Sequence, residues 1–235
     1  MLRFSEISET GERLKNSIIG FEVKNIKPVS DISNIEAHDF WDDFFTSSIE
    51  ETLFPELDIE ADVYGRSEDE FTFDFDINNS DFRELLLVFH KENWEKLGVD
   101  EKKSLLNKFA DLLGSQLDIQ NRPAIVYYNS DPCDYGCYDP NSNTIYINQS
   151  SFDDPQEIVD TVAHEMRHAY QYERAQKLET YEDYLYAYNF VNYISPYMSE
   201  DGYVNFIDYQ DQFVEAEARA FASLFVIEEE EKYNE

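Results

Sequence analysis

Apolar residues recur at helical spacing between residues 159 and 170 and predict one buried face of a long helix. This face consists of Val159, Val162, Ala163, Met166 and Tyr170. Just before it, Asp153-Asp154-Pro155 supplies a carboxylate that can cap a helix and a proline suited to the first helical position. No glycine or proline interrupts the chain from there to Lys177. We therefore predict a helix from about residue 155 to residue 177.

Shorter patterns predict further elements before this helix. Hydrophobic residues at helical spacing predict an amphipathic helix over residues 36–54. Strict alternation of Phe or Ile with polar residues over 71–77 predicts a half-buried strand. Two more helices are expected, one over residues 82–94 and one over 105–113 that ends at Gly114.

Two short runs of β-forming residues lead into the long helix, Ala124–Tyr128 and Thr144–Asn148. The stretch between them is rich in Asp, Asn, Pro and Gly, which are typical of turns. We expect the two runs to form a small antiparallel sheet packed on the long helix, which makes the fold α+β. In this interpretation residues 1–79 are an acidic N-terminal accessory region, and residues 80–235 form the domain that carries the chemistry.

The composition is that of a folded but very acidic protein. The chain has 235 residues, of which 42% are hydrophobic, including 18 Phe and 17 Tyr, so there is enough material for a core. Its formal net charge of −33 argues against direct binding to nucleic-acid phosphates or to anionic membranes. A solvated acidic surface explains the charge most simply; attraction of a basic substrate or partner and imitation of nucleic acid are the alternatives.

Short stretches of the sequence indicate the compartment of the protein and the oxidation state of its cysteines. Met1–Glu6 does not resemble a secretory signal, and no apolar run approaches the length of a membrane span, so we expect a cytoplasmic protein, with export that needs no cleaved signal as the alternative. Cys133 and Cys137 lie in a loop and are expected to be reduced thiols, although their spacing permits a disulfide. Without a nearby histidine they cannot complete a structural zinc site.

The segment His164-Glu165-Met166-Arg167-His168 points to metal chemistry. On a helix, a four-residue step places both imidazoles on one face, one turn apart, where they can bind a single ion with Glu165 beside them. The chain has only four histidines, so a chance match is rare. The other two, His38 and His90, have no second ligand at suitable spacing and are interpreted as surface or structural residues.

A catalytic zinc ion usually takes three protein ligands and keeps one position for water, so a third ligand must come from elsewhere in the chain. The best candidate region is the alanine-rich, strongly helical stretch over residues 213–222. Glu215 and Glu217 are two positions apart and point about 200° from one another, so they cannot both face the ion. Helical geometry alone leaves the choice between them open.

The chain resembles the zincin metallopeptidases that use glutamate as third ligand, and its layout is similar to small phage-associated or toxin-type zinc peptidases. The resemblance covers about residues 120–225 and includes Tyr138 and the run Thr144–Asn148. Several such families carry Glu-x-x-Ala in the second motif, which matches Glu215-Ala216-Glu217-Ala218 and implies that Glu215 binds the metal. Arg219 stands where an aspartate is often found, and Gln171-Tyr172-Glu173-Arg174 replaces the extension of the metzincins.

The resemblance implies a mechanism of peptide-bond hydrolysis. Zn²⁺ on His164, His168 and Glu215 would lower the pKa of a water to about 7, and Glu165 would act as general base and pass the proton to the leaving amine. A tyrosine is expected to help stabilise the oxyanion; the candidates are Tyr170, Tyr203 and Tyr209. Thr144–Asn148 is expected to be an edge strand that pairs with an extended polypeptide substrate.

Two other classes of function compete with a peptidase. One is a binding module on a zincin scaffold that has lost turnover, and the other is an acidic protein that imitates nucleic acid and engages a DNA-binding protein. Neither needs a general base next to two metal ligands, so His-Glu-x-x-His favours the enzyme. The sequence indicates neither the substrate nor the oligomeric state.

Overall fold

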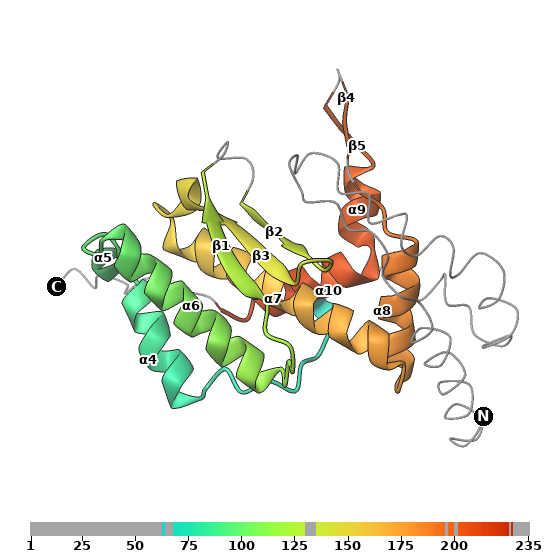
Figure 1. The fold of residues 1–235 in the computed structure, drawn as a ribbon, viewed down its shortest axis with the longest axis horizontal. Helices are drawn as coiled ribbons and strands as arrows, with labels where there is room; N and C mark the ends of the chain where they lie inside the picture. Colours follow the sequence, from blue (N-terminus) through green and yellow to red (C-terminus); the bar gives the residue numbers. More distant parts are fainter. Residues whose placement is uncertain are drawn as a thin grey trace, which may run out of the picture.

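The computed structural model describes residues 63, 68–129, 135–195, 197–199, 202–225 and 227. Its helices and strands mix along the chain, so the fold is α+β, as the sequence predicts (Figure 1). The predicted helix over residues 36–54 and Cys133 lie outside the described residues. The elements are, in order, η2 (Glu68–Glu70), α4 (Ser80–Phe89), α5 (Lys91–Trp94), α6 (Val99–Gln116), β1 (Ala124–Tyr128), β2 (Gly136–Asp139), β3 (Thr144–Asn148), η3 (Gln149–Ser151), α7 (Pro155–Lys177), α8 (Tyr181–Val191), β4 (Tyr197–Ser199), β5 (Gly202–Val204), α9 (Phe206–Asp211) and α10 (Phe213–Ala222).

The main sheet has three strands in the order β1-β3-β2. β3 pairs in parallel with β1, with Ile145 opposite Ile125, and antiparallel with β2, with Ile145 opposite Tyr138. The predicted antiparallel pairing of the two runs is therefore wrong. The hairpin forms instead between β3 and β2, a strand that the sequence hides because it contains Gly136 and Asp139, residue types that strands rarely use.

β3 is the central strand, so both of its edges are hydrogen-bonded within the sheet. The expectation that Thr144–Asn148 pairs with a substrate is therefore wrong, because no edge of this strand is open. β2 is the edge strand that lies against α7. At Gly136 an added Cβ would lie 2.7 Å from the backbone oxygen of Tyr146 and 2.9 Å from the methyl group of Thr161 on α7, so glycine permits this close approach.

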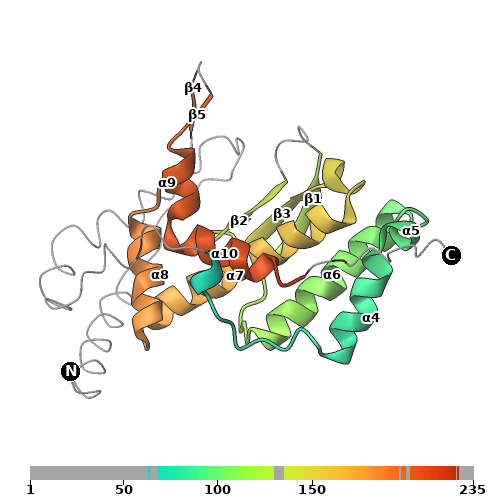
Figure 2. The same cartoon turned by 180° about the vertical axis from the view of Figure 1, so that it is seen from behind.

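The long helix α7 begins and ends where the sequence predicts, at Pro155 and Lys177. The side chain of Asp154 caps it by accepting from the backbone N–H groups of Gln156 and Glu157. Leu178 ends it in the left-handed region at φ 52°. Seen from behind, α10 lies along α7, with α8 beside them both (Figure 2).

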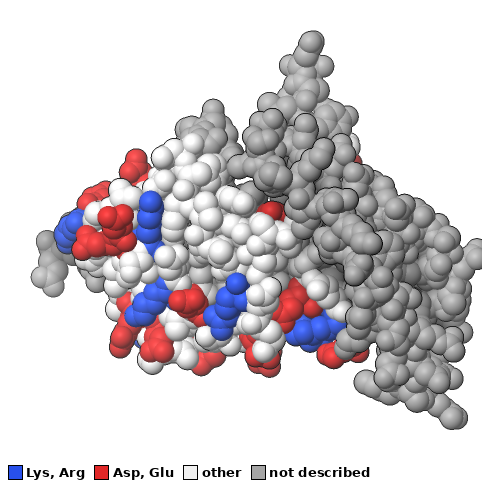
Figure 3. All heavy atoms as spheres, in the orientation of Figure 1, with Lys and Arg blue, Asp and Glu red and all other residues white. Residues whose placement is uncertain are grey.

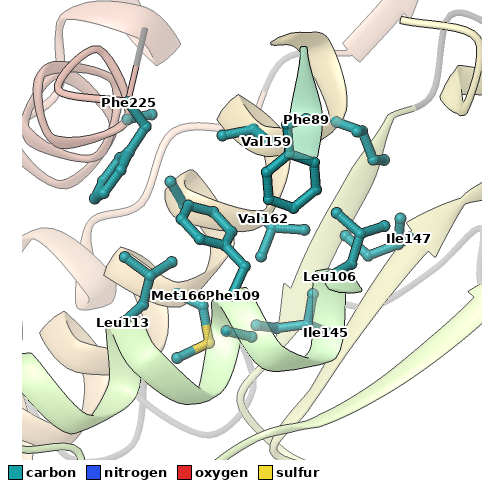
Figure 4. Packing of buried hydrophobic residues seen from close by; sticks show 14 of the residues in the cluster. Phe89, Leu106, Phe109, Leu113, Ile145, Ile147, Val159, Val162, Met166 and Phe225 are labelled. Atoms are coloured by element: carbon teal, nitrogen blue, oxygen red, sulfur yellow. The ribbon is translucent and has the colours of Figure 1, made fainter. Parts of the chain in front are cut away.

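The predicted apolar face of α7 packs into the main core. Val159, Val162 and Met166 meet α6 and the inner face of β3 (Figure 4). These three side chains are fully or almost fully buried. Removing such buried groups typically destabilises a protein by about 1–5 kcal/mol each, depending on size. This packing holds the helix rigidly and fixes where its other face points.

The predicted helix over residues 82–94 is divided in two at His90, whose backbone is extended at φ −51° and ψ 135°. Phe89 and Trp94 are five residues apart and would point about 140° away from each other on one straight helix. The break lets both rings bury completely, with their centroids 5.3 Å apart. The prediction of a single helix is wrong because this ring contact decides the path of the chain.

α6 continues past Gly114, which the sequence predicted as its end, to Gln116. Arg122 crosses over the helix at this point, donating to the backbone oxygen of Asp111 and to the hydroxyl of Ser115. A Cβ on Gly114 would lie 2.7 Å from the Arg122 side chain. The glycine therefore provides room for a packed arginine and does not terminate the helix.

Residues 71–77 alternate between half-buried and exposed positions, as predicted, but they do not form a strand. Phe73 packs on Phe221 of α10, and Phe75 packs on Phe82 of α4, at ring-centroid distances of 5.4 Å in each case. The backbone of Asp76 bonds to the side-chain amide of Gln116 through both its N–H and its C=O. A side-chain amide thus takes the place that a neighbouring strand would occupy.

The face shown in Figure 3 carries both signs of charge over the helices α4–α6, while the sheet beside them is largely uncharged. This mixed pattern is typical of a solvated helical surface.

In the described part of the chain, no helix combines the length and the apolar character needed to cross a membrane. The domain boundary at residue 79 stays a prediction, although residues 71–77 pack on the same core as the helices that follow.

Candidate metal centre

Three side chains converge between α7 and α10. His164 and His168 lie one turn apart on α7, and their Nε2 atoms are 3.0 Å from one another. The carboxylate of Glu215, on the first turn of α10, lies with one oxygen 3.3 Å from His164 Nε2 and the other 3.3 Å from His168 Nε2. Among the described residues, these three form the only group of three or more His, Cys, Asp or Glu that could hold a metal ion.

The separations fit a small divalent ion. Zinc lies about 2.0–2.1 Å from histidine nitrogen and about 2.0–2.2 Å from carboxylate oxygen, so ligand atoms at the corners of a tetrahedron lie roughly 3.3–3.4 Å apart. The 3.0 and 3.3 Å separations are close to these edges. The donor set of two imidazoles and one carboxylate also suits zinc, and it leaves a fourth corner open.

The structure separates the two candidate glutamates. Glu215 faces the imidazoles, whereas Glu217 faces the opposite way, where it bonds to the guanidinium of Arg167 and accepts from the Tyr186 hydroxyl at 2.7 Å. Both carboxylates are almost fully buried. Which glutamate faces the imidazoles is thus decided by which side of α10 lies against α7, and it is Glu215.

The charges of the three groups depend on one another. Burial by itself lowers the pKa of His168, but the Glu215 carboxylate outweighs it and raises that pKa to about 9. Burial by itself raises the pKa of Glu215, and the two imidazoles reverse this and hold it well below its ordinary value. A metal cation would take the place of the imidazole proton, which is the usual exchange of protons for metal at such a site.

Two tyrosines hydrogen-bond to the Glu215 carboxylate. The Tyr193 hydroxyl donates to Glu215 Oε1 at 2.5 Å, and the Tyr209 hydroxyl also hydrogen-bonds to this carboxylate. Burial raises the pKa of both phenols, so they stay protonated and donate. The sequence offers no signal for Tyr193, which lies between α8 and α9 and reaches the site only through the fold.

Glu165 follows His164 on α7 and lies on the wall of a cavity next to the three converging groups. Its side chain is buried, and burial raises its pKa, while the two imidazoles and the backbone N–H of Tyr138 on β2 favour its charged form. A buried carboxylate with a raised pKa is a stronger base than an exposed glutamate. Glu165 is thus placed to exchange a proton with a molecule in the cavity.

The cavity has a volume of about 680 Å³ and extends from His164 toward the N-terminus of α7, where Glu157 lines it. Tyr209, His164 and Arg219 are among the residues that line it. Arg219 donates to Glu68 at 2.7 Å and to the backbone oxygen of Gln210, and it contacts none of the three converging groups. The full lining comprises Tyr135, Gly136, Glu157, Asp160, Thr161, His164, Glu165, Phe206, Tyr209, Gln210, Arg219, Ala222 and Ser223.

The three tyrosines proposed from the sequence as oxyanion stabilisers end in different places. Tyr209 lines the cavity. Tyr170 is not among its lining residues; its ring centroid lies 4.3 Å from the Arg167 guanidinium carbon. The side chain of Tyr203 lies outside the described residues, as does His38.

No model of a known protein family matches the chain, and neither a curated protein nor a solved structure matches it. The site therefore has to be interpreted from its own geometry.

Proposed function

We propose that the protein is a zinc-dependent peptidase with a zincin-like site. The observation that carries the proposal is the arrangement of His164, His168 and Glu215 at tetrahedral separations, beside a cavity that has the Glu165 carboxylate on its wall. A structural site would enclose its ion with protein ligands, whereas this set leaves one position open toward the cavity. The combination of an open metal position and an adjacent base is what hydrolysis requires.

The chain's own groups have distinct roles in the proposed reaction. A zinc ion bound there would supply a water of lowered pKa and polarise the substrate carbonyl. Glu165 accepts a proton from the attacking water and donates it to the departing amine, which its burial and raised pKa favour. Tyr209 lines the cavity and hydrogen-bonds to Glu215; when substrate is bound, its single O–H turns from that carboxylate to donate to the oxyanion.

The position of β2 supports an extended polypeptide as substrate. β2 lies at the edge of the sheet beside the cavity, and Gly136 at its start lines that cavity. The backbone N–H of Tyr138 reaches Glu165, so this strand edge and the base face the same space. A peptide added to β2 as a further strand would pass its carbonyl groups over the metal site.

Zinc content and chelator-sensitive cleavage test the proposal. Purified protein is expected to hold about one zinc per chain and to cleave a casein-like substrate, with loss of cleavage on chelation and recovery on adding zinc. Protein that neither contains nor takes up zinc would overturn the proposal. Protein that holds zinc but cleaves no member of a diverse peptide library would support the alternative of a binding module on the same scaffold.

A further inference from the structure

Gln171 lies three residues after His168 on α7, and its side chain is completely buried. Its amide oxygen lies 2.8 Å from His168 Nδ1. Its amide nitrogen donates to the backbone oxygen of Val214 at 2.9 Å and to Glu217 Oε2 at 2.6 Å. All polar atoms of this amide are therefore used, and each of its contacts leads to α7 or α10.

These contacts fix the direction of the amide. Val214 and Glu217 both offer oxygen acceptors, so the nitrogen of Gln171 must face them and its oxygen must face His168. An oxygen there requires Nδ1 of His168 to carry the hydrogen. Nε2 is then the nitrogen that gives up its proton to a metal ion, and it is the nitrogen that faces His164 and Glu215.

We propose that Glu217 is a positioning residue for the metal centre, which acts on His168 through Gln171. This inference rests on the proposed zinc site and adds a function for the second of the two glutamates on α10. Glu217 does not touch the metal position; it holds the amide that selects the tautomer and orientation of the imidazole. Partners of this kind typically change metal affinity by about 10- to 100-fold.

Glu217 can serve as an anchor because it is itself held from two sides. Arg167 and the Tyr186 hydroxyl both bond to its Oε1, which leaves Oε2 for Gln171. The Arg167 guanidinium in turn lies against the rings of Phe73, Tyr170 and Phe221, at 5.0, 4.3 and 5.2 Å from their centroids. A continuous series of buried contacts therefore connects the aromatic core, through Arg167, Glu217 and Gln171, with His168.

The first test replaces the amide. Gln171→Leu should raise the zinc dissociation constant by about 10- to 100-fold, measured by competition with a chromogenic chelator. Tyr186→Phe is the matched control, because it removes a hydrogen bond from Oε1 of the same carboxylate and leaves the bond from Oε2 to Gln171 intact. Its zinc affinity should stay within about threefold of the parent protein.

The second test exchanges the two side chains. In Glu217→Gln the introduced amide nitrogen would face the Gln171 nitrogen. Gln171 then either loses this bond and is held by Val214 alone, or turns and presents an N–H to His168 Nδ1, which favours the wrong tautomer; both outcomes weaken its hold on the imidazole. Zinc affinity should fall by about 10- to 100-fold. Adding Gln171→Glu restores an acceptor to which both His168 and the introduced amide can donate, but it also turns a carboxylate oxygen toward the Val214 carbonyl oxygen. The double variant should therefore recover part of the loss and bind zinc at least about threefold more tightly than Glu217→Gln.

Thermal unfolding of the metal-free variants shows whether a loss of zinc affinity comes with a loss of fold stability or arises from the position of the imidazole alone. The visible absorption of the cobalt(II)-loaded proteins reports the ligand geometry directly, and the spectrum of the double variant should shift back toward that of the parent. The inference is overturned if Gln171→Leu binds zinc as tightly as Tyr186→Phe, or if the double variant binds no better than Glu217→Gln. These outcomes differ from a failure of the proposed function, in which the parent protein itself binds no zinc.

Discussion

Glu215 and Glu217 lie two residues apart on one helix, and both are buried, yet their carboxylates face partners of different chemistry. Glu215 faces two imidazoles, which can give up a proton to water. Glu217 faces the guanidinium of Arg167, which cannot be deprotonated. This difference leads to opposite expectations for two substitutions that are chemically identical.

Glu217→Gln should destabilise the metal-free protein by about 3 kcal/mol, because Arg167 keeps its charge without a buried counter-ion. Glu215→Gln should cost only about 1 kcal/mol, since the His168 imidazole can become neutral, but it should abolish zinc binding. Urea unfolding of the chelated proteins and zinc titration check the pair. Equal losses of stability in the two variants would contradict the assignment of their partners.

Glu165→Gln should keep one zinc per chain and lower kcat by about 10²- to 10⁴-fold, because the amide cannot accept the proton of the attacking water. Glu157→Gln is the control, since Glu157 lies on the same helix and lines the same cavity without adjoining the imidazoles. It should leave kcat within about threefold. A Glu165→Gln variant that cleaves as fast as the parent would show that the proton is transferred by another group.

Tyr209→Phe should lower kcat by roughly 10²-fold with little change in KM, because it removes a donor to the oxyanion. Tyr193→Phe is the comparison, since its hydroxyl donates to the same Glu215 carboxylate but does not line the cavity. We expect it to weaken zinc binding and to spare kcat at saturating zinc. If both variants affect only zinc binding, Tyr209 has no role in the reaction itself.

Asp160 introduces a dependence of stability on pH. Burial raises its pKa to about 6, although the Gln156 amide donates to it at 2.7 Å. A raised carboxylate pKa means that stability is fully present below the ordinary aspartate value and is lost as the pH rises through about 6. Asp160→Asn keeps the acceptor without the charge.

This variant should therefore be more stable than the parent by about 1 kcal/mol near pH 7.5, a figure reduced for partial exposure, and the gain should shrink toward pH 4.5. Urea unfolding of the chelated protein at several pH values measures it. Asp153→Asn, at an exposed position before the helix, serves as control. A gain that does not change with pH would show that the Asp160 charge is not its source.

The elements that the sequence predicted correctly depend on local interactions. Asp154 and Pro155 start α7 through bonds within its first turn, and the four-residue step from His164 to His168 is a property of any helix. The α+β class follows from the same local patterns. Such features need no knowledge of what packs against them.

The predictions that failed depended on neighbours distant in the chain. Residues 71–77 have the alternation of a strand, but a side chain of α6 and not a strand lies beside their backbone. β1 pairs with β3 in parallel and not antiparallel as predicted, and the antiparallel partner of β3 is β2, on its other edge. The break at His90 reflects the contact of Phe89 with Trp94, which no helical periodicity contains.

By itself the sequence determined that two imidazoles lie one turn apart on one helix with a carboxylate next to them, since helical spacing places those side chains whatever surrounds them. Only the tertiary structure decided that Glu215 joins them, that Tyr193 and Tyr209 hold that carboxylate, and that Glu217 turns to Arg167. The physical reason is that a helix fixes the angle between its own side chains but not its rotation against another helix. That rotation is set by the packing of α10 on α7, where burial of its apolar residues and the Arg167–Glu217 ion pair are satisfied together.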